Sequence, residues 1–226
     1  MTSRKFKLCC FIFTFCFACC YNVTAQWNDA GMRISITGEK KITSKLRTAF
    51  TLENRANDNF GRWSTVFVNV KAQYKINKAL TASLSYRYIM RNPAEENTEF
   101  RHRIFADLSY RIKFSKLTIT PRTRIQSQFT QHYANDISER INWLWRNKIT
   151  AKYSLKKWNP YIEGEIFYTL NNNRGNAINR LRMVAGCEYE LSKKTTLDIF
   201  YLRDNRMNVN NPLTLNVFGA GYTFSF

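Results

Sequence analysis

Apolar and polar residues alternate with a period of two along most of this chain. The pattern is clearest over residues 99–114, where Phe100 and Ile104 fall on one face and Arg103 and Asp107 on the other. A period of two is that of a β-strand, whose successive side chains point to opposite faces, and no helical period runs through these segments. The sequence therefore predicts an all-β protein.

Full alternating segments are separated in turn by short Lys-bearing turns and by longer Asn-rich loops. Short turns at one end and long loops at the other are typical of outer-membrane β-barrels. Because single-chain bacterial barrels have even strand counts, we predict about ten strands, with about twelve as the alternative. Met32 to Gly38 also alternates, so residues 26–40 either lie outside the wall or accompany a further hidden strand. The full segments lie near residues 45–55, 62–76, 79–91, 99–114, 117–129, 140–155, 158–170, 179–191, 195–203 and 213–226.

The segments on either side of the turn at residues 115–116 pair in a self-consistent register. In an antiparallel hairpin with that turn, Asp107 opposes Arg124 and Ser109 opposes Arg122. The apolar faces of the two segments then coincide, as a strand pair with one buried or lipid-facing side requires. We expect opposite charges to meet on the polar side of this pair.

The last segment supports a membrane barrel over a soluble β-sandwich. A free strand edge with an aromatic face invites aggregation in water, whereas in a closed barrel the edge is paired and the apolar face meets lipid. The segment resembles the assembly signal at the end of bacterial outer-membrane barrels, carried here by Tyr222, Phe224 and Phe226. Its second face is small and polar: Gly219, Gly221, Thr223 and Ser225. We therefore predict a closed antiparallel transmembrane β-barrel, with any open side of its lumen along this last strand.

The first 25 residues read as a secretory signal peptide. Arg4, Lys5 and Lys7 precede an apolar stretch of 13 residues, and small residues before the bond after Ala25 favour cleavage there. The predicted barrel domain is then residues 26–226. Of six cysteines only Cys187 remains after cleavage, so no internal disulfide and no Cys-rich metal site is expected.

Cleavage would leave 32 basic against 16 acidic residues, a net charge of +16. Such a charge suits nucleic acid or an anionic membrane, and the secretory signal argues against nucleic acid. The expected location is the outer membrane of a Gram-negative bacterium. The expected partners are the lipid bilayer, the barrel assembly machinery and small anions.

The chain resembles the DUF2490 family of Bacteroidota outer-membrane β-barrel proteins. The resemblance rests on degenerate motifs: Leu52-x-Glu-x-Arg (read loosely), Glu99-Phe-Arg-His-Arg, Pro121-Arg-x-Arg-x-Gln, Tyr161-x-Glu-x-Glu-x-Phe, Arg180-x-Arg and the C-terminal Tyr222-x-Phe-x-Phe. It covers nearly the whole mature chain. The resemblance implies an outer-membrane location and assigns no activity.

A ladder of basic residues falls on the face predicted to point inward. Rings of Arg and Lys favour anions, so one interpretation is a small passive pore with an anion-favouring lumen. The alternative is a closed structural barrel whose narrow interior is filled by Arg–carboxylate pairs. The basic residues are Arg87, Arg101, Arg103, Arg111, Arg122, Arg124, Arg140, Arg146, Lys148, Arg180 and Arg182, and the acidic partners are Glu99, Asp107, Glu163, Glu165 and Glu188.

An enzymatic role has one weak candidate pair. His102 falls on the lipid face, diagonal to Ser127, and outer-membrane phospholipases place a His and a Ser on that face. The pair lacks their His-x-Ser arrangement and an evident orienting residue, so a girdle histidine is the preferred interpretation. No enzyme activity is predicted, and no cofactor or metal site is expected, because no phosphate loop, dinucleotide fingerprint or metal-ligand spacing occurs.

Overall fold

The computed structural model of the protein describes residues 27–92, 98–131, 142–171, 177–208 and 212–226. The predicted signal peptide, residues 1–25, and the predicted lumen residue Arg140 lie outside these ranges. Among the described residues, no helix is both long and apolar enough to cross a membrane.

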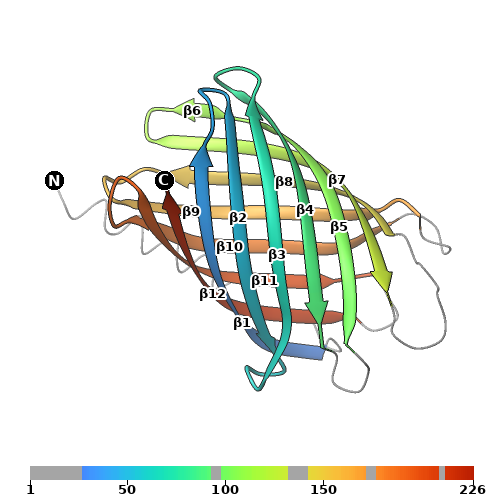
Figure 1. Ribbon diagram of the computed structural model, residues 1–226. Coiled ribbons are helices and arrows are strands. Elements are labelled where there is room, and N and C mark those ends of the chain that lie inside the picture. The colour runs from blue at the N-terminus through green and yellow to red at the C-terminus, as the bar shows by residue number, and fades with distance from the viewer. Residues whose placement is uncertain (1–26, 93–97, 132–141, 172–176, 209–211) are drawn as a thin grey trace.

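The described residues form a closed barrel with a wall of eleven strands (Figure 1). Consecutive strands pair antiparallel, and β6 is a short continuation of β5 beyond Arg111, because both pair with β7. The strands are β1 (Trp27–Lys41), β2 (Leu46–Asn57), β3 (Arg62–Lys75), β4 (Leu80–Arg91), β5 (Glu99–Tyr110), β6 (Ile112–Phe114), β7 (Leu117–Gln131), β8 (Asn142–Tyr153), β9 (Trp158–Thr169), β10 (Ile178–Glu190), β11 (Thr195–Arg206) and β12 (Leu213–Ser225).

The barrel closes through a parallel pair, β1 with β12, which runs from Trp27 beside Leu213 to Glu39 beside Ser225. This differs from the expected even count and fully antiparallel wall. Residues 26–40, left in doubt by the alternation, contain most of a full wall strand. An up-and-down meander with an odd number of strands brings its first and last strands together running the same way, so the closing ladder must be parallel.

The predicted hairpin register around the turn at residues 115–116 is confirmed. Asp107 pairs with Arg124 and Ser109 with Arg122 in the β5–β7 ladder. The strand is interrupted only at Arg111, whose side chain is exposed between β5 and β6. The ladders on either side of this pair align the polar rows of β3, β4, β5, β7 and β8 in the same way.

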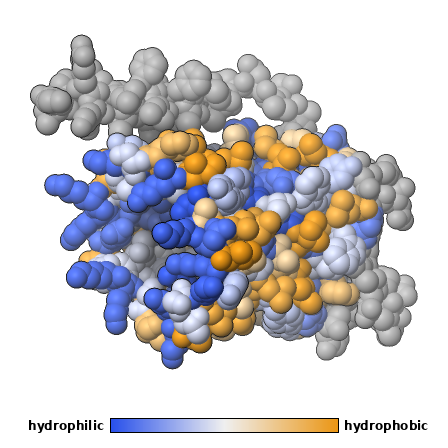
Figure 2. All heavy atoms as spheres, turned by 90° about the horizontal axis from the view of Figure 1, so that it is seen from above, coloured by the Kyte–Doolittle hydropathy of each residue, from blue (hydrophilic) through white to orange (hydrophobic). Residues whose placement is uncertain are grey.

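The exterior of the barrel is apolar and its interior is largely polar. Side chains such as Leu84, Ile149 and Ile199 are about 60% exposed on the outer face, whereas Asn69, Gln126 and Glu165 are buried on the inner face. Figure 2 shows hydrophobic side chains spread over the wall. A soluble protein hides its large apolar side chains from water, so this reversed distribution suits a wall that faces lipid.

The two ends of the barrel differ in their lysine content. Each of the five short turns within the described residues carries lysine at or beside the turn, and hydrophilic side chains gather at one end in Figure 2. The long-loop stretches contain no lysine in the sequence. We call the lysines at or beside the short turns the lysine rim. They are Lys40, Lys41, Lys45, Lys75, Lys78, Lys113, Lys116, Lys156, Lys157, Lys193 and Lys194.

Candidate functional site

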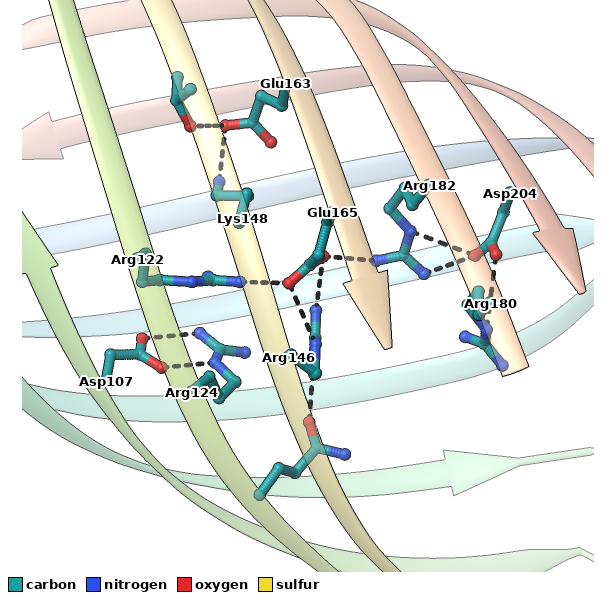
Figure 3. A network of polar contacts seen from close by, with 12 residues as sticks. Asp107, Arg122, Arg124, Arg146, Lys148, Glu163, Glu165, Arg180, Arg182 and Asp204 are labelled. Carbon is teal, nitrogen blue, oxygen red and sulfur yellow. Dashed lines mark hydrogen bonds and ion pairs between the residues drawn. The ribbon is translucent and has the colours of Figure 1, made fainter. Parts of the chain in front are cut away.

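The candidate site is the charged interior of the barrel, where inward side chains of neighbouring strands meet. Its centre is Glu165 on β9, which is 4% exposed. The Arg146 guanidinium donates to both Glu165 carboxylate oxygens, at 3.1 and 2.9 Å, and Arg122 donates to one of them. Arg182 lies 3.9 Å from the same carboxylate (Figure 3). One acid thus holds arginines from three other strands.

Two further acids extend this network sideways. Asp107 on β5 accepts two hydrogen bonds from Arg124, at 2.5 and 2.8 Å. Asp204 on β11 accepts from Arg182 at 2.5 Å and forms an ion pair with Arg180 at 3.5 Å (Figure 3). These bidentate and shared geometries are the strong form of Arg–carboxylate pairing.

The remaining predicted residues lie above and below this centre. Lys148 donates to Glu163 at 2.6 Å toward the short turns, and Lys152 donates to Glu188 at 2.5 Å. Toward the long loops Glu99 accepts from Arg101 and Arg91, and Arg103 donates to Gln128. Arg111 forms no ion pair with any described residue.

Buried phenylalanines support the arginines. Phe67, Phe105 and Phe167 point inward and are 3–4% exposed. The Arg87, Arg124 and Arg146 guanidinium carbons lie 3.8, 3.9 and 4.2 Å from the respective ring centroids. A guanidinium over an aromatic face gains electrostatic attraction in addition to packing, so these rings fix the cations in place.

Inward side chains fill much of the barrel interior at mid-height. Nine of the eleven wall strands in the described chain supply an inward side chain that is at most 8% exposed. On β2 and β10 the Glu53 and Arg182 side chains are 17% and 16% exposed. The nine residues are Arg33, Phe67, Ser85, Phe105, Gln126, Arg146, Phe167, Leu202 and Val217, and we call them the buried belt.

The expected open side along β12 is wrong. A Cβ atom at Gly219 would overlap the Phe200 ring, which reaches across from β11. At Gly186 it would lie 2.6 Å from the Tyr161 ring. The glycines leave room for inward aromatic side chains of neighbouring strands, which occupy the space that the small face was expected to leave open.

The sequence interpretation missed two interior residues, Arg33 and Asp204. Arg33 lies on β1, whose place in the wall was in doubt. Asp204 was assigned to a loop, although the alternation Asp198, Phe200, Leu202 continues through it to the end of β11. Both residues could have been found by extending the apolar–polar alternation into the neighbouring segments whose composition resembles a loop.

His102 and Ser127 are not joined by a hydrogen bond in the structure. The His102 Nδ1 atom lies 2.7 Å from the Tyr86 hydroxyl, and the imidazole packs against the Tyr88 ring. The Ser127 hydroxyl is buried without a partner among the described residues. The arrangement holds the imidazole among aromatic side chains, as in an interfacial girdle.

Two solved structures are similar to this chain, and the first of them supports the barrel fold. The beta domain of the Bordetella autotransporter Brka superposes with a TM-score of 0.53 and 14% identity over 82% of this chain and 86% of that one. The translocator domain of autotransporter NalP from Neisseria meningitidis gives 0.49 and 13%, over 77% and 72%. No curated protein matches the chain.

The family model described as "Protein of unknown function (DUF2490)" matches residues 30–213, which include nearly all of the wall from β1 to the start of β12. This chain therefore belongs to the DUF2490 family.

Proposed function

We propose that this protein is an integral outer-membrane β-barrel of a Gram-negative bacterium, of the Bacteroidota as its sequence motifs suggest, with a lumen closed by its own side chains. Its role is that of a membrane-embedded scaffold instead of an open pore. The observation that carries this proposal is the buried belt, which spans nearly the full circumference at mid-height. The apolar exterior supports the membrane location.

The energetics of the network also favour a closed lumen. A passage through the centre would separate Glu165 from Arg146 or Asp204 from Arg182. Breaking a buried pair leaves an uncompensated charge, at a cost of about 3 to 5 kcal/mol. Thermal fluctuations should therefore rarely open a passage through the centre of the barrel.

Planar-bilayer recording tests the proposal. The refolded barrel, its folding checked by heat-modifiable gel migration, is expected to give no stable current steps in KCl. The charge-neutral double variant Arg146→Ser, Glu165→Ser removes the central pair and is expected to conduct. Reproducible channels in the unaltered protein would overturn the closed barrel.

A small anion-favouring pore is the second candidate, and one observation favours it. The predicted lumen set contains eleven basic and five acidic residues, so the cationic side chains outnumber their acidic partners. In this alternative small anions are the transported partners. Channels with a reversal potential set by chloride in a KCl gradient would support it, and cation selectivity would exclude it.

We also propose that β12 is recognised by the barrel assembly machinery. Tyr222, Phe224 and Phe226 point outward near the short turns, and the last two rings stack 5.9 Å apart. Phe226→Ser is expected to lower the amount of folded, heat-modifiable protein in outer-membrane fractions. Unchanged assembly in this variant would argue against the signal.

Catalysis is not part of the proposed role. His102 is engaged with Tyr86, and the Ser127 hydroxyl is covered. The purified barrel is expected to release no fatty acid from phospholipid vesicles. Hydrolysis that is lost in Ser127→Ala would reverse this view.

A further inference from the structure

The interior contains a cavity of about 290 Å³ near the short-turn end. Its walls come from five neighbouring strands, β3, β4, β5, β7 and β8, together with Ala79 before β4 and Arg111 between β5 and β6. The register explains this gathering, because Thr81, Ser109, Arg122 and Lys148 are successive Cα partners across four of the strands. The cavity lies on the short-turn side of the Glu165 network.

The lining of the cavity is strongly basic. It contains five cationic side chains and one acid, Asp107, which is already paired with Arg124. Counting the partner acids Glu163 and Glu165 as well still leaves a net charge of +2. The barrel's own carboxylates therefore do not neutralise this cavity.

Several of its donors lack a partner. The Lys71 ammonium and the Arg111 guanidinium form no hydrogen bond or ion pair with any described residue. The Arg122 Nε atom is buried and has no hydrogen-bond partner in the described chain. A buried donor without a partner costs free energy, which a bound acceptor would recover.

Hydroxyl groups complete the donor set. Threonine and serine side chains from four strands line the cavity between the cations, among them Thr81, Ser109 and Thr120. Ammonium and guanidinium groups interleaved with hydroxyls match the several acceptor oxygens of a phosphate group. Ala79 is the only apolar residue among the described residues that line the cavity.

The lysine rim encloses the end of the barrel nearest to this cavity. Charges of one sign around an opening raise the local concentration of oppositely charged solutes and their association rate. Phe105 and Gln126 of the buried belt follow the lining residues Asp107 and Arg124 as the next inward pair toward the long loops. The result is a cup that is approached from the short-turn end.

We propose that this cup binds a small phosphate-bearing solute that enters from the short-turn side of the barrel. Lys71 and Arg111 supply the uncommitted charges, Arg122 supplies a free buried N–H, and the hydroxyls complete the shell. The wall strands separate the cup from the lipid side, so a soluble anion is the ligand, not a phospholipid headgroup. This site is independent of whether the mid-height belt opens.

Isothermal titration calorimetry of the refolded barrel in zwitterionic detergent, with inorganic pyrophosphate as the probe, tests the proposal. Saturable binding is expected at low salt. Lys71→Gln and Arg111→Gln should each weaken it about tenfold, because each removes a charged contact. Neither substitution leaves a carboxylate without its partner, so folding is expected to survive, which heat-modifiable migration checks.

The matched control is Lys193→Gln in the exposed rim, which changes the net charge equally but lies outside the cavity lining. It should weaken pyrophosphate binding less than about twofold, as a screened distant charge does. Absence of saturable binding at millimolar pyrophosphate would overturn the cup. Equal weakening in Lys71→Gln and Lys193→Gln would also overturn it, because binding would then be a surface effect.

Discussion

Inward-facing glycines and aromatic side chains share the space along β11 and β12. Gly219 leaves room for the Phe200 ring, and Gly164 on β9 has no atom within 4 Å of a hypothetical Cβ. Gly219→Ala should therefore destabilise the barrel by about 1–3 kcal/mol through overpacking. Urea unfolding of the refolded protein measures this, and Phe200→Ala should relieve the clash.

The matched control for that prediction is Gly164→Ala. With no clash, it should be neutral or stabilise the barrel by about 0.4–1 kcal/mol, because alanine loses less chain entropy on folding. Equal loss of stability in both variants would mean that Phe200 does not occupy the space beside β12.

Glu165 is the residue on which the charge network depends most. Glu165→Gln keeps the shape but leaves Arg122, Arg146 and Arg182 without their shared carboxylate. A loss of about 3 to 5 kcal/mol in the free energy of unfolding is expected, as for breaking a buried ion pair. The exposed pair of Glu39 and Arg47 serves as comparison, since Glu39→Gln should cost at most about 1 kcal/mol.

At the scale of elements, the parallel β1–β12 ladder is the feature that determines closure. Ile34 and Ala220 are Cα partners on the outer face of this ladder. In a Cys187→Ser background, Ile34→Cys with Ala220→Cys should form a disulfide, because neighbouring strands bring Cα atoms within bonding range. Non-reducing gels and mass spectrometry measure the cross-link.

Ile34→Cys with Phe224→Cys is the control pair for the register. Phe224 is the partner of Gly38, which lies four residues further along β1, about 13 Å away. No cross-link is expected there. A cross-link in this pair and none with Ala220 would refute the parallel register.

At the scale of the whole molecule, an odd strand count places the two ends of the wall on opposite sides. β1 begins beside Leu213, at the long-loop end, whereas β12 ends among the short turns. Short turns face the periplasm in bacterial barrels. Position 28 should therefore be accessible from the cell surface, and position 192 from the periplasm.

Single cysteines in a Cys187→Ser background test this topology. Asn28→Cys is expected to react with a membrane-impermeant maleimide on intact cells. Ser192→Cys, in a short turn, is expected to react only after the outer membrane is permeabilised. The reverse labelling pattern would place the barrel the other way round.

The sequence by itself determined what depends on near neighbours along the chain. The period of two assigned Ile104 and Asp107 to opposite faces, and the short turn at residues 115–116 fixed the pairing of Asp107 with Arg124, because a strand's geometry is local. The different lengths of turns and loops likewise distinguished the two ends.

The tertiary structure alone decided what depends on closure. Whether residues 27–41 join the wall is set by pairing with β12, nearly the whole chain away, and a parallel ladder there carries no local signature. The fit of Phe200 over Gly219 and the meeting of three arginines at Glu165 arise between strands, where side-chain volume and charge from different segments share one space. The alternation along a strand predicts which face of the sheet a side chain lies on, but its contacts with other strands are determined only when the barrel closes.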